Sequence, residues 1–259
     1  MARLRIDFFS DVLELGTSMT VLLPQRTSAR IGATGRAGAA APEVLYLLHG
    51  LSDDDTAWTR YTSLERYADA HGLAVVMPQV HRSFYADEEH GGRFWAFLTT
   101  ELPELVGTFL RVSTRREDTF VAGLSMGGYG AVKWALREPG RFAAAASLSG
   151  ALDIARRQGG EADDWNRPLM RRVFGERRLA GSDEDLLHLV ASGDPAELPR
   201  LYVACGTEDH LYPENMHFRD ACAARGIPLT VDFGPGDHEW GYWDAKIRDV
   251  LAWLPLPSA

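Results

Sequence analysis

The short motif with the clearest chemical meaning in this sequence of 259 residues is GLSMG at 123–127, which matches the pattern G-x-S-x-G. An apolar, β-rich segment, 118–123, runs directly into it, and a helix-like segment, 127–136, follows it. Flanking glycines allow a strained turn that presents the serine hydroxyl above a sheet. In this strand–turn–helix context the motif predicts Ser125 as a nucleophile.

A serine hydroxyl is a weak nucleophile at neutral pH, so it needs a histidine to accept its proton and a carboxylate to orient that histidine. On an α/β sheet with such a motif, the acid and the histidine follow the serine along the chain, in loops after later strands. Asp209 follows the apolar segment 200–206, and His238 lies in a glycine-rich loop after 229–233. We therefore predict Asp209 as the acid and His238 as the base.

Other acids and histidines fit this pattern less well. Glu208 adjoins Asp209 and stays open as an alternative acid, whereas Asp194 precedes its predicted strand and Asp232 lies within one. Four further histidines lie in or at the ends of predicted helices, or directly beside the proposed acid: His71, His188, His217 and His210.

Acyl chemistry also needs two N–H donors at the place where the carbonyl oxygen becomes negative. The residue after the nucleophile, Met126, supplies one from its backbone. The loop after the third predicted strand supplies the other, and there we predict the N–H of Leu51, since Gly50 permits a tight turn. We expect His49 to brace neighbouring loops by hydrogen bonds rather than to take part in catalysis.

Three consecutive aspartates at 53–55 suggest a cation site, but three adjacent carboxylates cannot all face one ion, so we interpret them as caps of a following helix. No spacing of histidine and cysteine indicates zinc, and no glycine-rich phosphate loop indicates a nucleotide. We expect neither a metal nor a cofactor.

Aromatic residues are frequent in the segments that flank the predicted site. Most are expected to pack in the core. Tyr85 and Trp240 lie on loops beside the site, so we predict that these two line a substrate pocket.

Eight short β-rich segments alternate with helix-like segments, which is the pattern of an α/β fold. Several are apolar on both faces, which indicates central strands of a mostly parallel sheet flanked by helices. The eight segments begin at Leu4, Met19, Glu43, Leu73, Asp118, Arg141, Arg200 and Leu229. The stretch 151–198, between the sixth and seventh strands, is longer than a simple crossover connection requires, so we predict a cap insertion there. We predict a single domain that covers residues 1–259.

Composition restricts the class of partner. Lys and Arg total 27 against 36 Asp and Glu, a formal net charge of −9, and such a surface repels nucleic acids and anionic membranes. The N-terminal segment has no uninterrupted apolar core, and no later stretch reaches the roughly 20 apolar residues of a membrane span. We expect a cytoplasmic protein that acts on a small molecule, without nucleic-acid or membrane partners. The sequence does not decide whether the protein forms a homo-oligomer.

Several segments, taken in order, resemble the putative-esterase branch of the α/β-hydrolases, the esterase D and tributyrin-esterase-like enzymes. They are HGLSDDDTAW, FYADEEHGGRFW, FVAGLSMGGYGA, SLSGALD, CGTEDHLY and GDHEWGYW. The resemblance covers nearly the whole chain. It implies an α/β-hydrolase fold and a serine carboxylesterase or acetylesterase that hydrolyses short acyl esters, from acetyl to butyryl. The site residues that it implies are a triad of Ser125, Asp209 and His238 and oxyanion donors at Leu51 and Met126.

Two alternatives remain. S-formylglutathione hydrolases resemble this chain at HGL but usually carry a cysteine shortly afterwards, where this sequence has SDDD. A thioesterase of that kind, or an acyltransferase, would keep the acyl-enzyme and change the substrate or the acceptor. A non-catalytic binding protein of the same fold is the other alternative, and a complete set of serine, acid and histidine argues against it.

Overall fold

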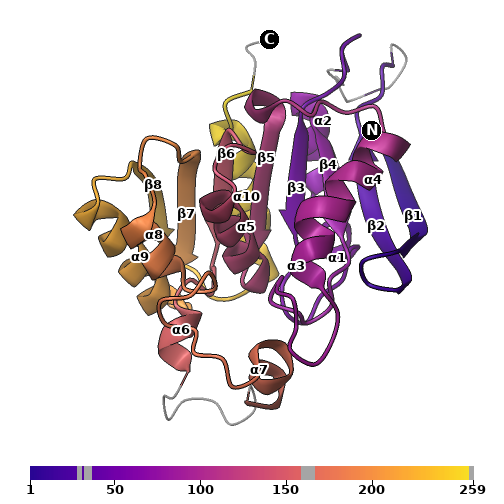
Figure 1. Cartoon of the computed structure of the whole chain (residues 1–259). Helices are drawn as coiled ribbons and strands as arrows, with labels where there is room; N and C mark the ends of the chain where they lie inside the picture. Colours follow the sequence, from indigo (N-terminus) through magenta and orange to yellow (C-terminus); the bar gives the residue numbers. More distant parts are fainter. Residues whose placement is uncertain (28–30, 32–36, 159–166, 257–259) are drawn as a thin grey trace.

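The chain folds around one eight-stranded sheet (Figure 1). The structure is a computed structural model that describes residues 1–27, 31, 37–158 and 167–256. The strands are β1 (Ala2–Ser10), β2 (Leu15–Leu23), β3 (Val44–Leu48), β4 (Ala74–Pro78), β5 (Thr119–Leu124), β6 (Ala144–Leu148), β7 (Arg200–Gly206) and β8 (Leu229–Gly234). They are arranged in the order β1-β2-β4-β3-β5-β6-β7-β8, in which β2 is antiparallel to both neighbours and all pairs from β4 to β8 are parallel. The predicted α/β fold with a mostly parallel sheet is confirmed.

The central strands supply side chains to two hydrophobic cores, one on each face of the sheet. In β3, Val44, Tyr46 and Leu48 belong to one core, while Leu45 and Leu47 belong to the other. All five are buried, as expected for a strand covered on both faces. This explains why the central strands are continuous apolar segments in the sequence instead of alternating with polar residues.

Helices cover both faces, as Figure 1 shows. The first face carries α4 (Leu102–Phe109), α5 (Met126–Arg137), α8 (Leu186–Ser192) and α9 (Tyr212–Ala224). The second carries α1 (Ala57–Tyr61), α2 (Leu64–His71) and α10 (Trp240–Trp253). The remaining segments are α3 (Phe94–Ala96), the π-helix η1 (Phe97–Glu101), the 3-10 helix η2 (Arg116–Asp118), α6 (Ile154–Arg157) and α7 (Arg167–Phe174). Of the helices in the described part of the chain, none combines the length and the apolar character needed to cross a membrane.

The long connection between β6 and β7 carries α6, α7 and α8. In Figure 1, α6 and α7 lie below the sheet, beyond the edge at which the parallel strands end. The predicted cap insertion, 151–198, corresponds to this connection, but its residues 159–166 lie outside the described part of the chain.

The start of α5 packs against the backbone of two strands without room for a side chain. A Cβ atom on Gly123 would lie 2.3 Å from the carbonyl oxygen of Gly127, and one on Gly127 would lie 2.3 Å from the carbonyl oxygen of Leu48, at the end of β3. Both distances are far below van der Waals contact. Glycine at these two positions therefore allows the turn, β5 and β3 to approach one another.

We expect Gly127→Ala to lower the free energy of unfolding by about 1–3 kcal/mol, because its methyl group would have to displace backbone atoms. Gly140→Ala is the matched control: nothing lies within 4 Å of a Cβ atom at that position. The effect of that control should stay within about 0.5 kcal/mol. Urea denaturation of both variants measures the difference, and equal stabilities would contradict the close approach.

Candidate active site

Ser125 lies in the turn between β5 and α5 with φ of +53° and ψ of −115°, a backbone conformation that residues other than glycine rarely adopt. Besides the hydrogen bond that its carbonyl accepts from Tyr129 in α5, two backbone hydrogen bonds from outside the helix hold it there. Its N–H donates to the carbonyl of Leu148 at 2.9 Å, and its carbonyl accepts from the N–H of Ala151 at 3.1 Å. The end of β6 and the residues after it therefore support the strained serine.

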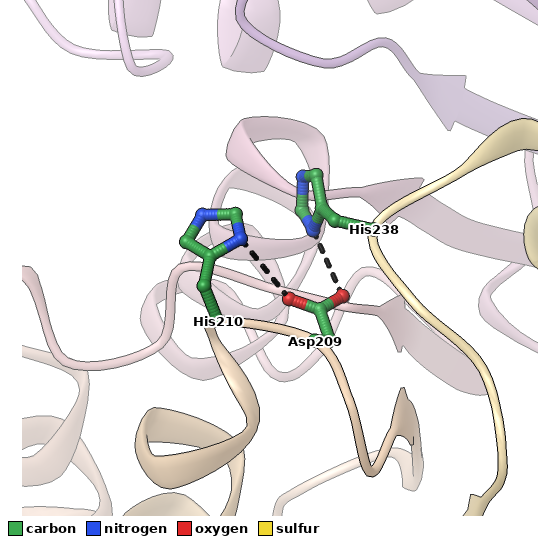
Figure 2. Close-up of side chains that lie close together, drawn as sticks. All are labelled: Asp209, His210 and His238. Carbon is green, nitrogen blue, oxygen red and sulfur yellow. Dashed lines mark hydrogen bonds and ion pairs between the residues drawn. The ribbon is translucent and has the colours of Figure 1, made fainter.

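Three side chains from three strand ends form a continuous hydrogen-bonded chain. His238 Nε2 lies 3.1 Å from Ser125 Oγ, and His238 Nδ1 lies 2.8 Å from Asp209 Oδ2 (Figure 2 shows the aspartate and the histidine). With Nδ1–H donating to the carboxylate, Nε2 remains an acceptor for the serine proton. The structure thus brings together the three residues predicted from the sequence.

The carboxylate of Asp209 is fully buried. Burial by itself raises the pKa of this group, but hydrogen bonds from His238, from the Leu211 N–H at 2.8 Å and from Ser149 outweigh burial and hold the pKa below its usual value. The carboxylate is therefore charged at neutral pH. A charge at this place holds the orientation of the histidine ring and suits the site to stabilise an imidazolium at His238.

Ser149 and Trp243 support this pair, and neither belongs to the residues predicted from the sequence. Trp243 Nε1–H donates to Ser149 Oγ at 3.1 Å, so the serine hydroxyl hydrogen remains available for Asp209. The ring of Trp243 packs edge-on against the ring of His238, with centroids 4.9 Å apart. Ser149 follows β6, so its place at a strand end was a usable signal. Trp243 lies inside α10, where no sequence pattern distinguishes it.

Two backbone N–H groups beside this chain, those of Leu51 and Met126, have no acceptor among the residues that the structure describes. Met126 opens α5, where the first N–H groups lack intrahelical partners and the helix dipole adds positive potential. Both residues border the same pocket as Ser125. They are the predicted oxyanion donors, and this geometry suits them to that use.

The loop after β3 is braced so that the N–H of Leu51 has a defined direction. The carbonyl of Gly50 accepts from the N–H of Asp53 at 3.2 Å and lies 2.7 Å from His49 Nδ1. In a trans peptide the C=O and the following N–H point in opposite directions, so anchoring this oxygen turns the Leu51 N–H away from it. His49 Nε2 accepts from the N–H of Val80 at 3.2 Å, and burial lowers the pKa of the ring and keeps it neutral. His49 thus braces two loops.

The structure places Tyr85 away from the pocket that it was expected to line. Its side chain is fully buried, and its hydroxyl donates to the carbonyl of His49 at 2.8 Å. Its neighbour Phe84 borders the pocket instead, as does Trp240. Phe84 and Tyr85 both have positive φ, 51° and 52°, and this unusual backbone decides which of the two side chains faces the pocket.

The pocket at this edge of the sheet has a volume of about 560 Å³. Aromatic rings form one side of it: His238, Trp243 and Trp240 follow one another with centroids 4.9 and 5.2 Å apart. The half-exposed Tyr61 packs against Trp240 with centroids 4.9 Å apart. Charged residues lie around the rest, namely Asp53, Arg82, Arg157 and Glu239. The pocket thus combines apolar surface with charges of both signs.

The three consecutive aspartates have three different surroundings. Asp54 accepts the N–H of Thr56 at 2.8 Å, directly before α1. Asp55 is buried and accepts from two hydroxyl groups of β2 at 3.1 and 2.7 Å. Asp53 borders the pocket, where burial raises its pKa. The N-cap residue of α1 is Thr56, and none of the described side chains caps this helix, so the interpretation of the aspartates as helix caps is wrong. Asp54 bonds to the cap residue itself and to Arg60.

The alternative acid, Glu208, is exposed, and its carboxylate accepts the N–H of Gly236 at 2.6 Å. His210 is also exposed, with Nδ1 at 3.5 Å from Oδ1 of Asp209 (Figure 2). Ligand atoms of Asp209, His210 and His238 lie within 4.8 Å of one another, close enough to share a metal ion. A cation there would have to break the hydrogen bond between Asp209 and His238.

Comparison with known proteins identifies the family. Residues 15–254 match the family described as "Putative esterase". The chain belongs to this family. It is 30% identical to an acetyl esterase from Caldicellulosiruptor saccharolyticus over the full length of both proteins.

Among solved structures the chain is similar to fluorophosphonate-binding serine hydrolase F of Staphylococcus aureus, with 33% identity, 98% of each chain covered and a TM-score of 0.87. It is also similar to an S-formylglutathione hydrolase of that organism, with 33% identity, 98% of each chain covered and a TM-score of 0.83. The putative-esterase chain therefore has the α/β-hydrolase fold that the sequence predicts.

We expect Ser149→Ala to lower kcat for p-nitrophenyl acetate by about tenfold, because a hydrogen bond to a charged carboxylate is lost. The pKa of Asp209 should rise in this variant. Because the pKa of Asp209 is lowered in the folded protein, its ionisation stabilises the fold at pH values above the usual pKa of 3.8. This stabilisation is lost as the pH falls through the pKa of Asp209 in the folded protein.

The stability difference between wild type and Ser149→Ala should therefore be largest near neutral pH and shrink towards about pH 3. Urea denaturation across this range and steady-state kinetics measure the two effects. Ser192→Ala, which removes an exposed hydroxyl that bonds to a helix carbonyl, is the control. A pH-independent difference would contradict the assigned contact.

Proposed function

We propose that this protein is a serine carboxylesterase that hydrolyses esters of short-chain acids, from acetyl to butyryl, through an acyl-enzyme. The observation that carries the proposal is the chain from Ser125 Oγ through His238 to the buried carboxylate of Asp209, with distances of 3.1 and 2.8 Å. Family membership across residues 15–254 and full-length similarity to an acetyl esterase support it.

In the acylation step, Ser125 Oγ attacks the ester carbonyl carbon while His238 Nε2 accepts the hydroxyl proton. The carbonyl oxygen becomes negative, and the N–H groups of Leu51 and Met126 are placed to donate to it. His238 then gives the proton to the leaving oxygen, the ester C–O bond breaks, and the alcohol departs. Asp209 stays charged and stabilises the imidazolium in between.

Water completes the cycle through the same groups. His238 Nε2 takes a proton from a water molecule as the water oxygen attacks the acyl carbon. The second oxyanion forms at the same two N–H groups. Its collapse expels Ser125 Oγ, which recovers the proton from His238, and the carboxylic acid leaves. This chemistry uses side chains, backbone donors and water, and we propose that it needs no cofactor.

The pocket supports a small ester as substrate. Phe84 and Trp240 place aromatic rings on its sides, and we propose these two as substrate-binding residues, with Phe84 in place of Tyr85. Ala151 and Arg157, from the connection after β6, also border it, which supports our interpretation of that connection as a cap.

A thioesterase acting on S-formylglutathione is the second candidate. The similarity to an S-formylglutathione hydrolase favours it. Arg82 and Arg157 border the pocket and could pair with the carboxylates of a peptide thiol. Arg157, however, is already paired with Glu214, and the loop after HGL carries SDDD in place of a cysteine. We therefore rank it below the carboxylesterase.

We propose a cytoplasmic location for this enzyme. Cys205 and Cys222 are both free and buried, which fits a reducing compartment.

A fluorophosphonate should label the wild-type protein once per chain, at Ser125, and mass spectrometry of the modified peptide identifies the site. Ser125→Ala should abolish labelling and lower kcat for p-nitrophenyl acetate by about 10⁴-fold or more, because the nucleophile is lost. Ser192→Ala should label like the wild type.

Ester specificity is measured with p-nitrophenyl acetate, butyrate and octanoate and with S-formylglutathione. We expect the highest kcat/KM for the acetate and butyrate esters. A clear preference for the thioester would support the second candidate. Labelling of Ser125 without hydrolysis of any of these substrates would indicate an acyltransferase, and no labelling would indicate a binding protein.

A further inference from the structure

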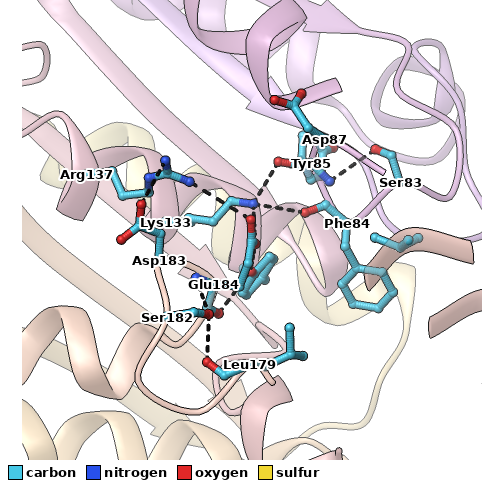
Figure 3. A network of polar contacts seen from close by, with 12 residues as sticks. Ser83, Phe84, Tyr85, Asp87, Lys133, Arg137, Leu179, Ser182, Asp183 and Glu184 are labelled. Atoms are coloured by element: carbon cyan, nitrogen blue, oxygen red, sulfur yellow. Dashed lines mark hydrogen bonds and ion pairs between the residues drawn. The ribbon is translucent and has the colours of Figure 1, made fainter. Parts of the chain in front are cut away.

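Lys133 is a fully buried lysine in the helix that follows Ser125. Its ammonium group lies 2.8 Å from the carbonyl oxygen of Tyr85, 3.4 Å from that of Phe84 and 2.8 Å from Oε2 of Glu184 (Figure 3). An ammonium group has three hydrogens, so each one has an acceptor. Burying a charge is costly unless it is paired and hydrogen-bonded, and here both conditions are met.

Glu184, from the connection between β6 and β7, is the counter-ion. Burial opposes its ionisation, but attraction and a hydrogen bond from Lys133, together with the Tyr129 hydroxyl at 2.5 Å, hold its pKa below the usual value. The rings of Trp95 and Tyr129 lie 4.7 and 5.0 Å from the lysine nitrogen and cover it. Burial lowers the pKa of Lys133, and the attraction and hydrogen bond of Glu184 oppose that effect. The ammonium group is thus paired with a carboxylate and shielded from water.

The two carbonyl groups belong to residues in a rare conformation. Phe84 and Tyr85 are consecutive residues with φ of 51° and 52°, and neither is glycine. Left-handed backbone of this kind persists only where the surroundings hold it. Ser83 Oγ accepts the N–H of Tyr85 at 3.1 Å, and Lys133 donates to both carbonyls. The lysine thus holds the carbonyl side of the strained segment.

This segment contacts the active site in two ways. Phe84 borders the pocket that contains the nucleophile. The hydroxyl of Tyr85 donates to the carbonyl of His49 at 2.8 Å, and His49 in turn contacts the Gly50 carbonyl, whose peptide carries the N–H of Leu51. A displacement of the segment would therefore reach both the pocket wall and one proposed oxyanion donor.

We propose that Lys133 is a positioning residue of this active site. By holding the carbonyls of Phe84 and Tyr85, it sets the position of the pocket wall. Through the contact of Tyr85 with His49, it also sets the direction of the Leu51 N–H. The proposal rests on the carboxylesterase function proposed above. The lysine itself does not border the pocket, so its effect on the reaction is transmitted through these contacts.

The first experiment separates the effect of the hydrogen bonds that Lys133 donates to the two carbonyls from the effect of its buried charge. Lys133→Met/Glu184→Gln removes both charges together with the two carbonyl contacts. We expect kcat for p-nitrophenyl acetate to fall about 10- to 100-fold with a smaller change in KM, and the rate of fluorophosphonate labelling at Ser125 to fall with it. Glu184→Gln keeps the lysine, its carbonyl contacts and an amide oxygen that can accept from the ammonium group. We expect it to lower stability, because the lysine loses its counter-charge, while kcat of the folded variant stays within about threefold of wild type.

Arg137→Gln is the matched control. Arg137 lies on the same helix and pairs with Asp183 at 3.3 Å and with Oε1 of Glu184 at 4.0 Å. It thus contacts the counter-ion of Lys133 but makes no hydrogen bond to the carbonyls of Phe84 and Tyr85. Its loss should weaken the contact between α5 and the connection from β6 to β7 and leave kcat at the wild-type level.

The second experiment follows the route through His49. Tyr85→Phe removes one hydroxyl group and leaves no buried charge unpaired, so it can be measured even if the lysine variant does not fold. We expect kcat to fall in Tyr85→Phe. In combination with Lys133→Met/Glu184→Gln, the loss should be smaller than the product of the separate losses, because the residues act in series.

Three results would overturn the proposal: a folded lysine variant with wild-type kcat, an equal loss of kcat in Glu184→Gln, or wild-type kcat in Tyr85→Phe. The first would assign Lys133 to stability alone, the second to its charge alone, and the third would remove the route through His49. Failure of the carboxylesterase function is distinguishable, because the wild-type protein would then neither hydrolyse the ester nor react at Ser125.

Discussion

The strained turn at Ser125 is the constraint on which the rest of the site depends. It requires α5 to begin directly against the backbone of β5 and β3, and glycines at 123 and 127 permit this where a Cβ atom would lie 2.3 Å from a carbonyl oxygen. The serine, the first N–H of α5 and the end of β3 are therefore fixed relative to one another before a substrate arrives. Donors that are already in place need no reorganisation during the reaction, so this steric constraint serves the catalysis that we propose.

Hydrogen-bond partners, more than position in the chain, decide what each carboxylate of the site can do. Burial opposes ionisation of both Asp209 and Asp53, yet hydrogen bonds hold the pKa of Asp209 below its usual value while burial leaves that of Asp53 raised. Glu208, adjacent to Asp209, is exposed and bonded to a loop N–H. Of these three carboxylates, Asp209 alone combines full burial, a lowered pKa and contact with His238, which are the properties that an orienting acid requires.

Much of this arrangement could be predicted because local patterns determine it. The eight apolar segments form the sheet, and since parallel strands end at one edge, residues that follow β5, β7 and β8 could be selected as neighbours. The position of Tyr85 could not be predicted, because it depends on two consecutive residues with left-handed backbone. Neither of them is a glycine or an asparagine, the residue types that indicate such a backbone in a sequence. Trp243 and Lys133 lie inside helices, and their partners Ser149 and Tyr85 are 94 and 48 residues away in sequence. Such contacts exist only in the folded chain.

The buried lysine shows why stability alone does not account for the polar contacts around this site. An apolar side chain of similar volume could fill the space under Trp95, and replacing a buried ion pair by apolar residues is often neutral or stabilising. No apolar side chain, however, can donate hydrogen bonds to two carbonyls that a left-handed backbone turns toward α5. A lysine can, provided that a carboxylate compensates its charge, and Glu184 does so from the connection between β6 and β7. The helix that begins after Ser125, the pocket wall and the connection between β6 and β7 thus meet at one ammonium group. In our proposal, this group links the shape of the pocket to the position of the serine.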